Sequence, residues 1–434
     1  MGGQEGPGLR DEGFDLEMSV YKRTPLEPMS EALIAVKEAA LDYSYASMGT
    51  RRIASVHEFY RYPARFPPAF SRAAIEAFSA PGDYMLDPFV GGGTSLVEAR
   101  KLGRGAIGAD VSHLACFVTR AKSNVYGSAS LDELRFWADE VAHVARVRPA
   151  PESLSDWERN GYLRNVDGRR TWRLRNVIAA LLDTTSDLST PQARLLARCA
   201  ILRTGQWALD MRDDVPGVGE FRGRLVEGVH GMTEVAEQYA RDVRIARRAA
   251  GLDGRRDRAI VNQRLPGLSS NRRIKRLPRP TLILTSPPYP GVYVNYHRWK
   301  VQGRWETPAP FWIAGCVDGS GIATYTMSAR NGKSLDNYFR KLETAWADLV
   351  RMMSSSTWLV QVVGFSDRNA QLLRYLDAMA RAGLKEHKFD ELRSHSDGRL
   401  WREVPGRRWW VKAREKAGTA PHTSHEVLLV HTLR

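Results

Sequence analysis

A single stretch, residues 84–110, constrains the fold of this chain of 434 residues more than any other feature. Residues 84–87 are apolar up to a final aspartate and predict a short buried strand. The sequence Pro-Phe-Val-Gly-Gly-Gly-Thr follows as a glycine-rich turn, and residues 95–102 predict a helix after it. A second short strand is expected at 106–109. A β-α-β unit of this kind builds doubly wound α/β sheets with parallel strands.

Asp110 follows the second of these strands and is a candidate binding residue. Glycines at a strand-to-helix turn allow a ligand to approach the backbone closely. Asp110 lies about twenty residues after the glycines, which is the spacing expected for a carboxylate that binds a ribose diol. The alternative role for Asp110 is a helix N-cap. We favour ribose binding because the aspartate belongs to a β-α-β unit.

A second turn with distinctive chemistry, Thr285-Ser286-Pro287-Pro288-Tyr289, follows the apolar run 281–284. Its two prolines fix their φ angles and donate no backbone N–H. The neighbouring carbonyls and the Ser286 hydroxyl are therefore held in a nearly fixed arrangement beside the ring of Tyr289. Such a turn can accept hydrogen bonds from an exocyclic amino group while the tyrosine stacks on the base that carries it. The alternative is an ordinary strand followed by a proline turn.

The region between the two turns has a helical pattern and divides the α/β sequence into two halves. The expected organisation is an N-terminal extension at 1–50, a cofactor-binding half at 51–125, a helical insertion at 126–258 and a catalytic half at 259–434.

The same periodicities predict the remaining elements. Helices are expected at 28–45, 69–78, 338–353 and 370–382, and strands at 259–261, 281–284, 358–364 and 427–431. Residues 57–68, with four aromatics and three prolines, predict either an extended surface segment or a proline-bounded lead-in to the next helix that packs its aromatics in the core; taken alone, the segment favours packing in the core. A long loop rich in aromatic and basic residues, 293–305, is expected to contact nucleic acid or to form a lid on its own domain.

The charge of the chain points to a polyanionic partner. Lys and Arg number 64 against 49 Asp and Glu, a formal net charge of +15, which favours nucleic acid over a membrane surface. An arginine-rich proteome would give the same composition. No run approaches the roughly 18 apolar residues of a membrane span. Cys116, Cys199 and Cys316 are far apart, which indicates neither a disulfide framework nor a zinc site, so we expect a cytoplasmic protein without a metal or a membrane partner.

Taken together, the motifs resemble those of the S-adenosylmethionine-dependent DNA amino-methyltransferases, which methylate N4 of cytosine or N6 of adenine. The resembling segments are the cofactor loop at 87–94, the catalytic motif at 285–289, the segment at 57–68 that covers the cofactor and the closing strand at 425–430. The resemblance implies a Rossmann-like, seven-stranded, mostly parallel methyltransferase sheet with a reversed last strand, interrupted by the inserted helical domain. In some subclasses of the family the sequence-reading domain lies between the two motifs, so the resemblance assigns target recognition to the insertion at 126–258.

The resemblance also implies the roles of individual residues. S-adenosyl-L-methionine would be bound by Tyr62, Phe66, Asp87, Phe89, Gly91, Gly93, Thr94, Asp110 and Thr285. The target base would be taken by Ser286, Pro287, Pro288 and Tyr289, with the Ser286 side chain and the Pro287 carbonyl accepting the two amine N–H groups. Asn262-Gln263-Arg264 stands where many relatives carry Gly-Asp, a departure that affects the adenine-ring contacts.

Double-stranded DNA is the expected partner. Its expected contacts are Arg244 and Arg248 in the insertion, His297 and Arg298 in the aromatic loop, and Arg408 in a basic, aromatic stretch near the C-terminus. Serine in the catalytic turn favours cytosine N4 within the family, in a restriction-modification or phage-defence setting with partner proteins of that kind. The alternatives are methylation of adenine N6, methylation of RNA bases, and a nucleic-acid-binding protein that has lost catalysis.

Overall fold

The computed structural model describes residues 28–42, 53–63, 65–144, 154–254, 256–290, 298–318, 327, 333–365, 367–404 and 424–434. His297, Arg408 and most of the N-terminal extension lie outside these residues.

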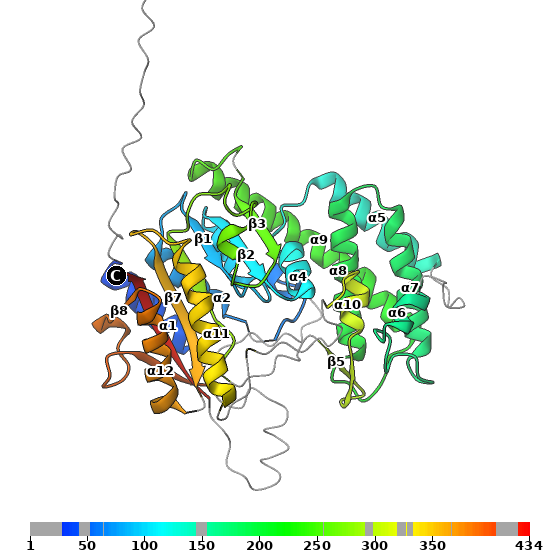
Figure 1. The fold of residues 1–434 in the computed structure, drawn as a ribbon. Coiled ribbons are helices and arrows are strands. Elements are labelled where there is room, and N and C mark those ends of the chain that lie inside the picture. The colour runs from blue at the N-terminus through cyan, green and yellow to red at the C-terminus, as the bar shows by residue number, and fades with distance from the viewer. Residues whose placement is uncertain are drawn as a thin grey trace, which may run out of the picture.

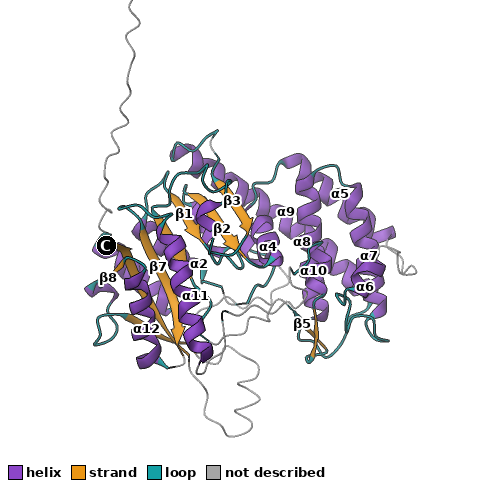
Figure 2. Ribbon diagram, viewed as in Figure 1, coloured by secondary structure: helices purple, strands orange, loops and turns teal. Residues whose placement is uncertain are grey.

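The centre of the molecule is an eight-stranded sheet in the order β3-β2-β1-β4-β7-β10-β8, with β9 also paired to β10 (Figure 2). Its strands are β1 (Tyr84–Asp87), β2 (Gly105–Asp110), β3 (Arg258–Asn262), β4 (Leu282–Thr285), β7 (Trp358–Phe365), β8 (Leu384–His387), β9 (Leu400–Val404) and β10 (Ser424–Leu433). Strands β3, β2, β1, β4 and β7 are parallel, and β10 is antiparallel to β7. The chain therefore has the predicted Rossmann-like α/β fold with a reversed closing strand.

The sheet has one strand more than the seven expected. Strand β9 pairs with Ser424–Leu428 and strand β8 with Val430–Leu433, so the two lie end to end along one side of β10. Their sequences, Leu-Lys-Glu-His and Leu-Trp-Arg-Glu-Val, mix charged and apolar residues. Short strands of this composition at a sheet edge lack the apolar run that marks the central strands.

Helices cover both faces of the sheet (Figure 1). On one face, α1 (Ser30–Leu41), α2 (Pro68–Phe78) and α3 (Thr94–Lys101) pack against alternate side chains of the central strands. On the other, α11 (Lys333–Val350) and α12 (Arg368–Arg381) bury Tyr338, Trp346 and Tyr375. Strands β1, β4 and β7 are buried along their whole length, which is why they read as continuous apolar runs.

A helical block lies beside the sheet, to the right in Figure 1. It contains α5 (Ser128–Val144), α6 (Leu154–Arg159), α7 (Trp172–Thr184), α8 (Pro191–Leu209) and α9 (Val218–Ala249), and α4 (His113–Ser123) connects β2 to it. The aromatic segment before α2 contributes to the core of this block, with Phe59 and Tyr60 almost fully buried. Tyr62 and Phe66 are buried as well, so of the two alternatives for residues 57–68 the structure confirms packing of the aromatics in the core.

Part of the region predicted as a loop at 293–305 forms a β-hairpin on the helical block. The hairpin consists of β5 (Trp299–Val301) and β6 (Trp305–Thr307) and is followed by α10 (Ala309–Ala314). Trp299 is 1% exposed, and its Nε1 donates a hydrogen bond of 3.0 Å to the Tyr60 hydroxyl. Burial in the helical core accounts for the position of Trp299, and no nucleic-acid contact is needed to explain it. The prediction of an aromatic loop without secondary structure is wrong for the residues of the hairpin.

Within the ranges described above, no helix is both long enough and apolar enough to cross a membrane.

Candidate active site

The two predicted motifs meet at one edge of the sheet. Strand β1 lies between β2 and β4, and all three run parallel. The turns that follow Asp87, Asp110 and Thr285 therefore leave the sheet at the same carboxyl edge, where doubly wound folds bind their ligands. The structure brings the aspartates of the cofactor motif and the start of the Ser-Pro-Pro-Tyr turn into one place.

Asp87 connects the two motifs directly. Its Oδ1 accepts hydrogen bonds from the Thr285 hydroxyl at 2.8 Å and from the Phe89 backbone N–H at 3.1 Å, and its Oδ2 accepts from the Ser95 hydroxyl at 2.5 Å. The carboxyl group is buried, and burial raises its pKa to about 6 although these hydrogen bonds oppose the rise. Asp87 is thus a firmly oriented acidic group shared by the ends of β1 and β4.

Asp110 is oriented by backbone donors on both oxygens. Gly91 N–H donates to Oδ2 at 3.0 Å and Ser112 N–H donates to Oδ1 at 2.9 Å. Burial again raises the pKa, to about 6, while these two hydrogen bonds lower it. Because a carboxylate oxygen can accept more than one hydrogen bond, the group retains acceptor capacity for hydroxyl donors.

The helix that follows β2 is capped by a different residue. The N-cap of α4 is Ser112, whose hydroxyl accepts a hydrogen bond from Ala115 N–H at 3.3 Å. The alternative role considered for Asp110 is therefore filled by Ser112. Asn262, at the end of β3, donates its side-chain amide to the carbonyls of Asp110 at 3.0 Å and Val111 at 2.9 Å. The departure from Gly-Asp at this position thus serves to tie the ends of β2 and β3 together.

The backbone conformation and the packing of the glycine turn both favour glycine over residues with a side chain. Gly91 and Gly93 have φ angles of 47° and 78°, which favour glycine. A Cβ on Gly92 would lie 2.8 Å from Cβ of Tyr62, and one on Gly93 would lie 2.7 Å from Oγ1 of Thr119. Tyr62, 3% exposed, therefore packs directly on the turn, and its contact with a cofactor stays a prediction.

The other predicted cofactor residues lie around this turn. Thr94 is the first residue of α3 and is buried. The ring of Phe66 lies 5.3 Å from that of Phe70 in the core beneath α2. The ring of Phe89 lies 6.5 Å from that of Trp346 on α11. Packing within the protein explains the positions of both phenylalanines, and their contact with a cofactor stays a prediction.

The Ser-Pro-Pro-Tyr turn is held by three other elements. The ring of Tyr289 packs on Gly364 of β7, because a Cβ on this glycine would lie 2.6 Å from Cε2 of the tyrosine. The Tyr289 hydroxyl donates to Oε1 of Glu426 on β10 at 3.0 Å and accepts from the Ser286 hydroxyl at 3.2 Å. The Tyr338 hydroxyl of α11 donates to the Pro288 carbonyl at 2.9 Å.

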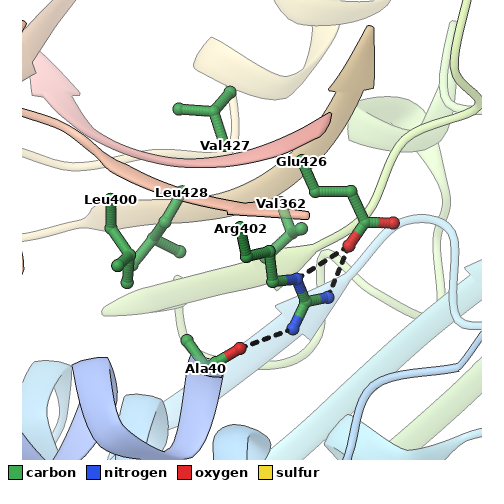
Figure 3. Close-up of a pocket in the computed structure, with 7 residues that line it drawn as sticks. All are labelled: Ala40, Val362, Leu400, Arg402, Glu426, Val427 and Leu428. Atoms are coloured by element: carbon green, nitrogen blue, oxygen red, sulfur yellow. Dashed lines mark hydrogen bonds and ion pairs between the residues drawn. The ribbon is translucent and has the colours of Figure 1, made fainter. Parts of the chain in front are cut away.

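Glu426 was missed by the sequence prediction. It is 1% exposed, and its Oε2 accepts two hydrogen bonds from Arg402, from Nε at 2.8 Å and Nη2 at 2.6 Å (Figure 3). The available signal was a glutamate within the apolar run of the closing strand, since charged residues are rarely buried without a partner. The cavity drawn in Figure 3 has a volume of about 10 Å³, room for a single water, and is not a ligand pocket.

Two of the arginines predicted to contact DNA, Arg244 and Arg248, lie apart from this edge. Arg244 donates to the Tyr126 carbonyl at 3.2 Å, and Arg248 forms an ion pair of 3.5 Å with Asp253. The end of α9 that carries them approaches Gly82, before β1, at the opposite edge of the sheet. Arg298 forms an ion pair of 3.7 Å with Glu306.

A basic and aromatic surface lies at the hairpin, and its residues Arg304 and Trp305 belong to the stretch 293–305 that the sequence predicted to contact nucleic acid. Arg170, Asp213, Gln302 and Arg304 line a hollow of about 330 Å³. Trp305, 51% exposed, has the Arg304 guanidinium 5.4 Å from its ring centre. In Figure 1, β5 lies at the lower end of the helical block, and the carboxyl end of β7 points to the same end of the molecule.

Among the residues that the structure describes, no group of three or more His, Cys, Asp or Glu side chains is arranged to hold a metal ion.

Comparisons with known proteins find relatives of part of this chain. Residues 41–119 match a family model for N6/N4 methyltransferases, described as "DNA methylase". Among curated proteins, the type II methyltransferase M.MjaII of Methanocaldococcus jannaschii is 30% identical over 83 residues, which are 19% of this chain and 16% of that protein. The type II methyltransferase M.BsoBI of Geobacillus stearothermophilus is 27% identical over 143 residues, 31% of this chain and 28% of that protein.

Two solved structures of the rRNA methyltransferase aviRa from Streptomyces viridochromogenes are 11% and 10% identical, with TM-scores of 0.32 and 0.30. They cover 91% and 90% of this chain and 96% and 95% of their own.

The family match contains Tyr62, Asp87, the glycine turn and Asp110. Together with the two type II methyltransferases, it supports a DNA amino-methyltransferase, without distinguishing cytosine N4 from adenine N6. The chain spans less than a third of either curated relative in these alignments.

Proposed function

We propose that this chain transfers a methyl group from S-adenosylmethionine to N4 of cytosine in duplex DNA. The observation that carries the proposal is the hydrogen bond of 2.8 Å between Thr285 and Asp87. It joins a glycine-rich turn suited to a nucleoside cofactor to a proline-rich turn suited to an amino group. The family match covers the first of these turns, and the second lies beyond it.

The residues at the carboxyl edge fit S-adenosylmethionine. Asp110 has acceptor capacity for a ribose diol on both of its oxygens, each already oriented by one backbone N–H. The glycine turn has no side chains to block an approaching ligand, and Asp87 provides a carboxyl group beside it. Val111, 37% exposed and next to Asp110, offers an apolar surface for the adenine ring. When bound, this cofactor supplies an electrophilic methyl group on a sulfonium.

The Ser-Pro-Pro-Tyr turn would activate the amino group of the target base. The lone pair of an exocyclic amine is delocalised into the ring, so the amine is a poor nucleophile. Acceptance of its two N–H groups by the Ser286 hydroxyl oxygen and the Pro287 carbonyl draws electron density onto nitrogen. Fixed acceptors of this kind work through positioning and preorganised dipoles.

In the reaction, the amine nitrogen attacks the methyl carbon. The nitrogen lone pair would form the new N–C bond to the methyl group that the cofactor supplies, the pair of the former S–C bond would remain with the departing sulfur, and the nitrogen would give up one proton to solvent. The target base must first leave the duplex, which costs a few kcal/mol. Stacking on Tyr289 returns roughly 1 to 3 kcal/mol of this cost.

We place the duplex against the helical insertion and the β5–β6 hairpin. The net charge of +15 favours a polyanionic partner, and Arg170, Arg304 and Trp305 form a surface of basic and aromatic groups. We retain the division at 1–50, 51–125, 126–258 and 259–434, with β5, β6 and α10 contributing to the recognition region. Restriction or phage-defence proteins are the partners that this activity would serve.

Methylation of adenine N6 is the second candidate, because the family model covers both chemistries and the same two acceptors would serve either amine. The test is to incubate the purified chain with duplex DNA and labelled S-adenosylmethionine, then digest the DNA and identify its nucleosides by mass spectrometry. We expect 4-methylcytosine. Detection of 6-methyladenine would select the second candidate, and label in RNA but not in DNA would overturn both. No heat on calorimetric titration with the cofactor would identify a protein without catalysis.

A further inference from the structure

Four side chains form a continuous chain of hydrogen bonds behind the Ser-Pro-Pro-Tyr turn. The Ser286 hydroxyl donates to the Tyr289 oxygen at 3.2 Å, and the Tyr289 hydroxyl donates to Oε1 of Glu426 at 3.0 Å. Arg402 donates to the other oxygen of Glu426 through two nitrogens, at 2.8 and 2.6 Å. This series of hydrogen bonds thus connects the candidate catalytic serine to a buried ion pair between β9 and β10.

The ion pair determines which group donates and which accepts in each of these hydrogen bonds. A carboxylate accepts hydrogen bonds and has none to donate, so the tyrosine hydroxyl must donate to Glu426. The phenol has a single proton, and its oxygen is left to accept from Ser286. The Ser286 hydroxyl therefore donates its proton in a hydrogen bond to the Tyr289 oxygen, and the lone pairs of the Ser286 oxygen stay available to accept a hydrogen bond from another group. An acceptor is what a bound amine requires at this position.

The backbone explains why Glu426 stands where it does. In the antiparallel pairing of β10 with β7, Glu426 is opposite Gly364, and the tyrosine ring packs on that same glycine. The absence of a Cβ at Gly364 therefore brings the Tyr289 hydroxyl to the carboxylate.

The carboxylate is itself held in place. The Nη1 atom of Arg402 donates to the Ala40 carbonyl, near the C-terminal end of α1, at 3.0 Å (Figure 3). With both Arg402 and Glu426 under 10% exposed, water has little access to replace these bonds. Buried, charge-assisted hydrogen bonds of this kind fix geometry more firmly than neutral ones.

We propose that Glu426 is a positioning residue that sets the direction of the Tyr289–Ser286 hydrogen bond and so makes the Ser286 oxygen an acceptor for the amine of the target base. This inference rests on the proposed function. Glu426 does not touch the base in this account and acts only through the tyrosine hydroxyl.

The test is the single-turnover rate of methyl transfer in Tyr289→Phe, which keeps the ring on Gly364 and leaves the Arg402–Glu426 pair intact. Loss of one oriented hydrogen bond should lower the rate about ten- to a hundredfold, with cofactor affinity and DNA affinity unchanged. Tyr84→Phe is the matched control. Its hydroxyl donates to the Arg256 carbonyl at 2.7 Å from the first residue of β1, at the opposite edge of the sheet, and the variant should keep the wild-type rate.

A double-mutant cycle tests whether Glu426 acts through the tyrosine. Glu426→Gln should also lower the rate, because an amide can donate as well as accept and no longer fixes the direction. In the Tyr289→Phe background the same substitution should lower the rate no further. Ser286→Ala should likewise remove the effect of Tyr289→Phe.

Two results would overturn the inference while leaving the function in place: an active wild type with an equally active Tyr289→Phe, or rate losses that multiply in the double variant. A wild type that transfers no methyl group to nucleic acid would overturn the proposed function and this inference together.

Discussion

The Thr285 hydroxyl donates a hydrogen bond of 2.8 Å to Oδ1 of Asp87, across 198 positions of sequence. The two residues end neighbouring parallel strands, and both are almost fully buried. Because Thr285 also begins the Ser-Pro-Pro-Tyr turn, this bond sets the position of the target-base turn relative to the cofactor turn.

Removal of this hydroxyl should weaken both folding and cofactor binding. Thr285→Val keeps the side-chain shape but deprives a buried carboxyl group of one donor, which raises the pKa of Asp87 further above about 6. The free energy of unfolding should fall by about 1 to 3 kcal/mol. Denaturant unfolding and calorimetric titration with S-adenosylmethionine measure the two effects. Thr285→Ser should restore both, and a valine variant equal to wild type would contradict the role given to this bond.

Cofactor binding should depend on pH near 6. Burial raises the pKa of Asp110 to about 6 from its usual value near 3.8, so in the free protein this carboxyl contributes stability below about pH 4 that is lost as the pH rises to about 6. Ribose hydroxyls need the ionised carboxylate as acceptor. Affinity should therefore fall as the pH is lowered through 6, and binding at pH 6 should release protons.

Calorimetry in two buffers of different ionisation enthalpy measures this proton release. Asp110→Asn should bind more weakly and lose the part of the pH dependence that Asp110 contributes, leaving any part that comes from Asp87, whose pKa burial also raises to about 6. A wild-type affinity that stays constant between pH 5 and pH 8 would show that Asp110 does not accept hydrogen bonds from the cofactor.

The glycine turn offers a matched pair of substitutions. A Cβ on Gly92 would approach Cβ of Tyr62 to 2.8 Å, and neither atom lies at the flexible end of a side chain. Gly92→Ala should displace Tyr62, lower stability by about 1 to 3 kcal/mol and weaken cofactor binding. Gly223→Ala, in α9 with no atom within 4 Å of the new methyl group, should be neutral or stabilise by up to about 1 kcal/mol. Equal effects of the two substitutions would exclude close packing as the reason for Gly92.

The hairpin surface should contribute to DNA affinity more than the end of α9 does. Arg304 lines the hollow beside exposed Trp305, whereas Arg248 lies at the edge of the sheet opposite the site. Arg304→Ala should weaken duplex binding and reduce the slope of log affinity against log salt by about 1. Arg248→Ala, which also removes one exposed positive charge, is the control and should change the slope less. The reverse order, measured by fluorescence anisotropy over a salt series, would place the DNA along α9.

The fold was predictable where local signals and burial agreed. Strand β1 has the predicted bounds, because an apolar run that stops at an aspartate before three glycines has few alternatives. Strands β8 and β9 were missed, because they are short and partly charged and are stabilised only by pairing with β10. Trp299 was assigned to a loop because its partner, Tyr60, lies 239 positions away.

The site was predictable only as far as its motifs extend. Asp87, Asp110 and Tyr289 stand out in the sequence, because glycine and proline patterns surround them. The partnership of Tyr289 with Glu426 spans 137 positions and depends on the register that places Glu426 opposite Gly364. The register between two strands is set by the packing of the whole strands, so no local sequence pattern predicts it.

The central claim is that one turn holds the methyl donor and the other holds the target base. The rate of methyl transfer to duplex DNA as a function of S-adenosylmethionine concentration tests it most directly, in wild type, Asp110→Ala and Tyr289→Ala. Asp110→Ala should need a higher cofactor concentration and then approach the wild-type rate, whereas Tyr289→Ala should stay inactive at every concentration. A Tyr289→Ala variant that reaches the wild-type rate, or an unchanged cofactor dependence in Asp110→Ala, would contradict the account.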